Sequence, residues 1–219
     1  LQWDSEQGNG LRSTAPHLCH GDELPSLMIA SDNRRLLHGS CRKPHFAGED
    51  ALVRTDSWLA ERRNQPEQRP AWLLMTGDQV YVDDVSGPLL VAVHQLIARL
   101  GLFDEALEGA TVADSQALYQ SDDTYYRREQ LLPDVPSNMA VRDRFFGGVR
   151  KPVFTSANAH NHLISLAEML AMYLLVWSPV PWRLIQPAMP DGLNDEERQR
   201  YQSEQQQIDG FVDGLPQVA

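Results

Sequence analysis

Two short apolar runs in this chain each end in a glycine that is followed by a potential metal ligand. LLHGSC covers residues 36–41, and AWLLMTG covers residues 71–77, with Asp78 next. Runs of this length, bounded by turn residues, are typical of strands, and the second reads as a buried strand. Open α/β sheets hold ligands just outside the carboxyl ends of their strands. The pattern therefore predicts an α/β fold with Cys41 and Asp78 at adjacent strand ends.

Further segments extend this expected fold. LMIAS, residues 27–31, fits another strand, bounded by a polar turn. Residues 51–63 carry a moderate helical face, and residues 89–100 repeat apolar side chains at helical spacing, with Gly101 placed as a C-terminal cap. Residues 114–132 are weakly helical. The order of strands and helices predicts α/β with flanking and inserted helices.

Two more helices are predicted toward the end of the chain. In the stretch 155–177, Asn or Ser caps precede a helix that is apolar on nearly all sides, so we expect this helix to be buried. The prolines of SPVPW end it, because proline cannot continue a helix. Residues 195–209 form a polar helix with acids in the first turn, where the helix dipole favours them.

The composition narrows the function classes. The chain has 219 residues and a net charge of -11, which disfavours a general nucleic-acid or anionic-membrane binder, because such proteins usually show a basic face. Two cysteines, Cys19 and Cys41, could pair but do not make a disulfide scaffold. The longest apolar run, 169–177, is too short for a membrane span of about 20 residues. No secretion signal opens the chain, and both the bacterial cytoplasm and the cell envelope stay open as compartments.

Three side chains that follow the predicted strands, those of Cys41, Asp78 and Tyr81, are potential metal ligands. A strand ending in Gly-Asp is common in two-metal phosphoesterases, where one carboxylate bridges two cations, although most Gly-Asp pairs are simple turns. The Cys41 thiolate is a soft ligand suited to iron or zinc, and the Tyr81 phenolate suits ferric iron. The plainer alternatives are a small buried Cys41 and a packed aromatic Tyr81.

Neighbouring polar residues are weaker candidates. Arg42 could bind a substrate phosphate as a bidentate donor, or form a structural salt bridge. Asp83 and Asp84 could orient ligands or sit in a solvated turn. His38 and His45 flank the cysteine, and packed or surface histidines are commoner than ligands in such positions.

Two further features belong to the apolar helix. Its HNH triplet lacks the zinc or ββα context of a nuclease, so Asn161 and His162 are expected to cap the helix. Glu168 needs a partner if it is buried, and Arg150, Lys151 or a chain terminus could serve.

A family resemblance emerges from these motifs. HGSCRKP followed by LLMTGDQVYVDD, with the later FFGGVRKPVFTSANAHNHLISLAEMLAMYLLVWSP, resembles the PhoD-like alkaline phosphatase and phosphodiesterase family of calcineurin-like metallophosphoesterases. The resemblance covers residues 36–182. It implies a mixed iron and calcium centre in which Cys41 and Tyr81 bind iron and Asp78 bridges the iron to the second metal.

The chain also departs from that family. The β-sandwich domain before GSC and the downstream block of Asp, His and Asn ligands are missing. Together with the absent initiator methionine, this suggests a fragment. We expect an irregular lead-in at 1–26 and the N-terminal part of a metallophosphoesterase domain at 27–219, with a helical insertion at about 89–210. The rest of a parent polypeptide would then complete the metal site.

The function expected from these features is metal-assisted hydrolysis of phosphate monoesters or diesters by the parent enzyme. A metal-activated water would attack phosphorus, and Arg42 would stabilise the charge on the phosphoryl oxygens. Alone, the chain should bind metal incompletely and hydrolyse little. The alternative is a non-catalytic interaction scaffold on a degenerate or truncated phosphatase core.

Overall fold

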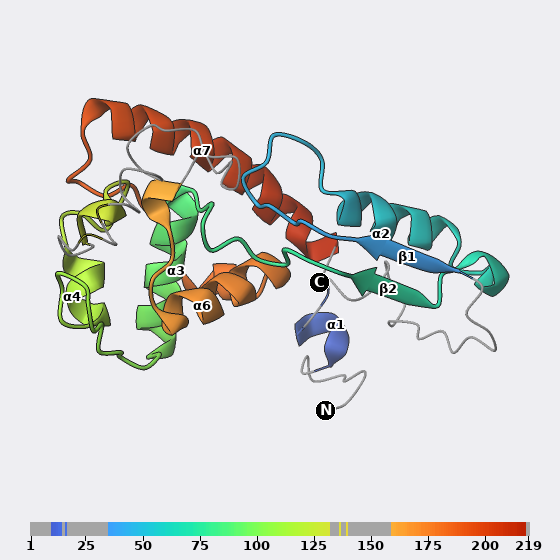
Figure 1. Ribbon diagram of the computed structural model, residues 1–219. Helices are drawn as coiled ribbons and strands as arrows, with labels where there is room; N and C mark the ends of the chain where they lie inside the picture. The colour runs from blue at the N-terminus through green and yellow to red at the C-terminus, as the bar shows by residue number, and fades with distance from the viewer. Residues whose placement is uncertain are drawn as a thin grey trace.

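The computed structural model describes residues 10–14, 16, 35–131, 136, 139 and 159–217 of the chain (Figure 1). Its strands and α-helices are α1 (Leu11–Thr14), β1 (Leu36–Gly39), α2 (Ala51–Glu61), β2 (Trp72–Met75), α3 (Gly87–Leu100), α4 (Ser115–Gln120), α6 (Leu166–Trp177) and α7 (Asp195–Gly214). Short 3₁₀ turns are η2 (Pro66–Gln68), η3 (Arg128–Leu131), η4 (Ala159–Asn161), η5 (Pro181–Leu184) and η6 (Leu215–Gln217). The fold mixes helices with a small parallel sheet, so its broad class is α/β, as predicted.

The sheet consists of β1 and β2, which pair in parallel. Leu36 lies opposite Trp72, and the register runs on to Gly39 opposite Met75. Because parallel strands need a crossover, α2 connects them, capped by the Asp50 side chain. Both predicted strands in the described residues are confirmed, although each is shorter than expected. The predicted strand at 27–31 lies outside the described residues.

The prediction that residues 71–77 form a buried strand is wrong. Trp72 is 61% exposed, and Leu73 and Leu74 are each 50% exposed. Within the described part of the chain the sheet has only two strands, with α2 running alongside it (Figure 1), so most strand side chains still reach solvent. An apolar run indicates a strand, but it does not indicate whether other elements pack against the faces of the sheet.

The main core lies among α3, α6 and α7. Side chains such as Leu89, Leu96, Leu175 and Ile208 are almost fully buried there. Helix α3 matches its prediction closely: Gly101 ends it in the left-handed region, with φ 62°, and its N–H donates to the Ile97 carbonyl.

Helix α6 differs from its prediction in two ways. It begins at Leu166, well inside the predicted stretch 155–177, because Ser165 and Glu168 form a capping box there. It is also buried on one side only. Leu166 is 51% exposed and Tyr173 is 48% exposed, since α3 and η5 pack against the opposite face.

Helix α7 is the longest element. The predicted helix at 195–209 is confirmed and continues to Gly214, with an Asn194 and Glu197 capping box at its start. Figure 1 shows α7 running from the helical group toward the sheet, and η6, which follows α7 directly, contacts α2. The weakly helical stretch 114–132 resolves into α4 and η3. None of the helices in the described ranges is long and apolar enough to cross a membrane.

Candidate metal centre

The two strand ends continue side by side beyond the sheet. The Thr76 N–H donates to the Gly39 carbonyl at 3.0 Å, and the Cys41 N–H donates to the Gly77 carbonyl at 3.0 Å. The Arg42 N–H then donates to the Asp78 carbonyl at 3.1 Å. This backbone pairing places Cys41 and Asp78 next to each other at the carboxyl edge of the sheet.

Both residues adopt a backbone conformation that L-amino acids rarely use. Cys41 has φ 61° and Asp78 has φ 45°, in the left-handed region. Such conformations cost on the order of 1–3 kcal/mol each and cluster at functional sites, where the surroundings enforce them. A plain turn would have used glycine at these positions.

The side chains of the two residues are in direct contact. The Cys41 Sγ–H donates to Asp78 Oδ2 at 3.1 Å, and the Ser40 hydroxyl donates to Cys41 Sγ at 3.2 Å. Both Cys41 and Asp78 are exposed to solvent. The thiol and the carboxylate therefore form a pair that a solvent-borne cation can reach.

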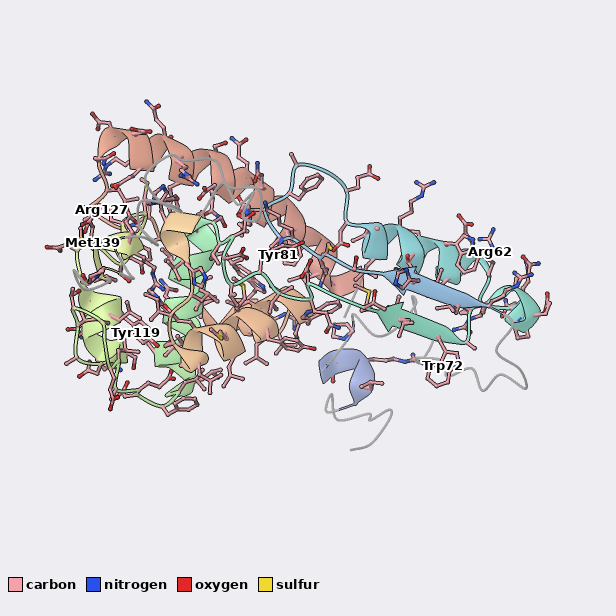
Figure 2. All side chains as sticks on the ribbon, in the orientation of Figure 1. Arg62, Trp72, Tyr81, Tyr119, Arg127 and Met139 are labelled. Atoms are coloured by element: carbon pink, nitrogen blue, oxygen red, sulfur yellow. The ribbon has the colours of Figure 1, made fainter. Side chains whose placement is uncertain are left out.

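Tyr81 joins this pair from the segment after β2. Burial, the hydrogen bond with the Cys41 side chain and the charge of nearby carboxylates raise the pKa of Tyr81 to about 12. Figure 2 labels Tyr81 near the middle of the molecule, between the sheet and the helices. The structure thus brings together the three side chains that the sequence singled out as ligands. Without a cation, Tyr81 stays a neutral phenol at physiological pH.

The donor set fits one half of the expected centre better than the other. A thiolate, a carboxylate and a phenolate match the preferences of ferric iron. A calcium ion takes 6–8 oxygen ligands, and of the three side chains gathered at this edge only Asp78 has two oxygens, one for each of two cations. Within the described residues, no group of three or more His, Cys, Asp or Glu side chains is arranged to hold a metal. The three side chains therefore suit iron by donor type, but they are too few to complete a dinuclear centre.

Arg42 lies beside the cysteine but faces the interior. It is 6% exposed and binds Asp50 Oδ2 through Nε at 3.1 Å and Nη2 at 2.8 Å. Its guanidinium also stacks on the rings of Trp177 and Phe211. Of the two roles considered for Arg42, this arrangement is the structural salt bridge, and we assign it no contact with a substrate phosphate.

The other flanking residues take structural positions. His45 is buried, and its Nε2 lies 2.8 Å from Asp84 Oδ1, while Lys43 binds the same carboxylate. Burial alone would raise the pKa of Asp84, but these two hydrogen bonds hold it well below its usual range. His38 is exposed and contacts the Thr76 hydroxyl at 2.7 Å. Asp84 is therefore a buried, paired acid rather than a solvated turn residue.

Sequence reasoning missed a buried charge network away from the strand ends. Glu168 is fully buried, and its partners are Arg128, at 2.6 Å, and His94, at 2.8 Å. Arg150 and Lys151, the partners suggested from the sequence, lie outside the described residues. Arg128 lies in a weakly helical stretch beside Arg127, and no local pattern distinguishes the buried Arg128 from the half-buried Arg127.

The HNH triplet also has a different role from the one expected. Asn161 does not cap the helix: its side-chain oxygen accepts the Tyr126 N–H at 2.7 Å, supporting a residue with φ 63°. The His162 ring contacts the Leu163 carbonyl. Ser165 provides the cap instead, so the capping prediction was right only in naming a serine before the helix.

Comparison with known proteins adds no relative: no protein-family model, curated protein or solved structure matches the chain. The site must therefore be interpreted from its own geometry.

Proposed function

We propose that Cys41, Asp78 and Tyr81 are ligands of an iron-containing centre that serves the hydrolysis of phosphate esters. The observation that carries this proposal is the meeting of a thiol, a carboxylate and a phenol at one sheet edge, two of them on left-handed backbone. The resemblance of the same motifs to PhoD-like metallophosphoesterases supports it. So does the general position of ligands at the carboxyl ends of strands.

In this proposal each side chain has a distinct task. Cys41 and Tyr81 would hold the iron as thiolate and phenolate, and the Asp78 carboxylate would be shared between the iron and the second cation. When bound, the two cations supply an activated water and neutralise charge on the phosphoryl group. Cys41 and Asp78 are exposed, so a substrate can approach the same edge from solvent.

The number of ligand side chains indicates that this chain supplies only part of the metal centre. Three side chains do not complete a dinuclear centre, so we propose that the remaining ligands come from other parts of a parent polypeptide in a metallophosphoesterase-type fold. The exposed strand face, where Trp72 is 61% exposed, is consistent with further covering structure. By itself the chain should bind iron weakly and turn over little substrate.

The test combines metal analysis with an activity assay. The longest natural polypeptide containing this chain should copurify with iron and calcium and hydrolyse para-nitrophenyl phosphate esters. Cys41→Ala and Asp78→Asn should each lose iron and activity, whereas Ser57→Ala, an exposed change in α2 whose hydroxyl bonds only the Val53 carbonyl, should keep both. Full iron content in Cys41→Ala would remove the ligand assignment, and a metal-free, inactive polypeptide would leave the scaffold interpretation in its place.

A further inference from the structure

One helix end holds both loops of the candidate site. The Trp177 indole N–H, at the end of α6, donates to the Gln79 carbonyl at 2.9 Å. One residue earlier, the Val176 carbonyl accepts a hydrogen bond from Arg42 Nη1. Gln79 directly follows Asp78, and Arg42 directly follows Cys41. Each strained residue therefore has its next neighbour tied to the same turn of helix.

Arg42 is fixed from several sides at once. Its guanidinium lies 4.8 Å from the ring centres of both Trp177 and Phe211, so it is stacked between α6 and α7. Asp50, which binds the same guanidinium, also accepts the Leu52 N–H and so caps α2. The loop after Cys41 is thereby joined to three helices.

The chemistry of a helix end explains why these partners meet there. The last four carbonyls of a helix have no partner within it, and the helix dipole makes that end negative. A buried guanidinium satisfies such a carbonyl and complements the dipole. The rigid indole of Trp177 provides both a stacking surface for Arg42 and a donor for the second loop.

The strained backbone makes this support necessary. Left-handed conformations at non-glycine residues persist only where surrounding structure over-determines them. Cys41 and Asp78 are both exposed, so their own side chains bury little surface that could hold the backbone in place. The two loops constrain each other through the Cys41 N–H to Gly77 carbonyl and Arg42 N–H to Asp78 carbonyl hydrogen bonds. The adjacent residues Arg42 and Gln79 add a second constraint, because α6 holds them both.

We infer that the carboxyl end of α6 sets the separation of the Cys41 and Asp78 loops, with Trp177 and Arg42 as positioning residues of the metal centre. The inference rests on the proposed function for its metal readout. Helix α6 would then help to form the site although it supplies no ligand. A metal site depends on the residues behind its ligands, and changing them typically weakens metal binding 10–100-fold.

The test compares two tryptophans that make equivalent hydrogen bonds. Trp177→Phe keeps an aromatic ring against Arg42 but removes the donor to the Gln79 carbonyl. Trp182→Phe is the matched control, because the half-buried Trp182 donates its indole N–H to the Leu175 carbonyl of α6 at 2.8 Å rather than to either loop. Thermal melting of both variants checks that each remains folded.

Two readouts decide the outcome. Ferric iron should bind Trp177→Phe about tenfold more weakly than wild type, with a shifted visible charge-transfer band, while Trp182→Phe matches wild type. Independently of metal, in a Cys19→Ser background, a thiol reagent should label Cys41 several-fold faster in Trp177→Phe, because the Asp78 partner of the thiol is released.

The results separate this inference from the proposed function. Unchanged labelling in Trp177→Phe, or equal acceleration in both tryptophan variants, would overturn the positioning role. If wild type takes up no iron, the proposed function fails, while the labelling rates still decide whether α6 positions the two loops.

Discussion

At the scale of single residues, the clearest feature is the left-handed backbone at Cys41 and Asp78. Both positions would suit glycine, yet the chain places a thiol and a carboxylate there, in contact at 3.1 Å. Reactive side chains at positions where the backbone disfavours them suggest that these residues lower the stability of the fold in favour of a site. The loss of stability can be measured as a change in the free energy of unfolding.

Replacing Cys41 with glycine should stabilise the metal-free protein. Glycine adopts φ near 61° without strain, and the exposed thiol loses little packing, so the free energy of unfolding should rise by about 1 kcal/mol. Urea denaturation measures the change. Ser40→Gly is the control, because it adds backbone freedom without relieving a left-handed residue and should destabilise. A loss of stability in Cys41→Gly would show that the backbone is not strained there.

A second residue-scale prediction concerns His94. Burial lowers the pKa of His94 from its ordinary 6.5, and the nearby Arg128 charge acts in the same direction, against the hydrogen bond with Glu168. The unfolded chain therefore binds this proton first as pH falls. Below pH 6.5 the free energy of unfolding should decrease by up to about 1.4 kcal/mol per pH unit through this group.

Denaturation of wild type and His94→Gln between pH 5 and 6.5 checks this linkage. Wild type should lose stability more steeply as pH falls, since the variant has no imidazole to protonate. Equal slopes for the two proteins would mean that His94 is protonated in the folded state as readily as in the unfolded chain.

At the scale of elements, the buried network joins α3, α6 and η3 through His94, Glu168 and Arg128. Arg128→Met would leave Glu168, which is fully buried, with too little compensating charge, and should cost about 3–5 kcal/mol. Arg127→Met is the neighbouring control: its side chain is 38% exposed, so loss of its ion pairs should cost less than about 1 kcal/mol. Similar losses in both variants would contradict the network's role.

The contact between α3 and α7 depends on a glycine. The Gly87 N–H and the Tyr126 hydroxyl both donate to Glu204 Oε2, at 2.8 and 2.7 Å. A Cβ on Gly87 would lie 2.0 Å from the Tyr126 hydroxyl oxygen. Gly87→Ala should therefore destabilise by at least about 1–3 kcal/mol.

Gly210→Ala provides the opposite expectation within α7. A Cβ there meets nothing within 4 Å, and alanine is the better helix former, so stability should rise by about 0.5–1 kcal/mol. Thermal unfolding of the two alanine variants gives the comparison. Equal stability of Gly87→Ala and Gly210→Ala would show that the Tyr126 hydroxyl does not lie as close to Gly87 as described.

At the scale of the whole molecule, the sequence predicted the ends of several elements, but it did not predict which side chains other elements bury. The Gly101 cap, the α7 start and the meeting of Cys41 with Asp78 follow from nearby residues or from the geometry of parallel strands. The exposure of Trp72 and the burial of Arg42 depend on how many elements surround them. Sequence periodicity carries no such information, which is why the buried strand and the buried α6 were predicted wrongly.

The same distinction applies to the site. Residue chemistry was enough to nominate Cys41, Asp78 and Tyr81, because thiol, carboxylate and phenol are ligand groups wherever they lie. It could not identify Trp177, whose contact with the Gln79 carbonyl joins residues far apart in the sequence. Long-range supports of this kind become visible only when the helices are placed.

The most direct test of the account is a titration of ferric iron into the metal-free chain, followed by visible absorption. We predict a saturable charge-transfer band from thiolate and phenolate to iron, which loses its phenolate component in Tyr81→Phe and weakens strongly in Cys41→Ala. No band at saturating iron, or a band that is unchanged in both variants, would contradict the central claim that these residues form one metal centre.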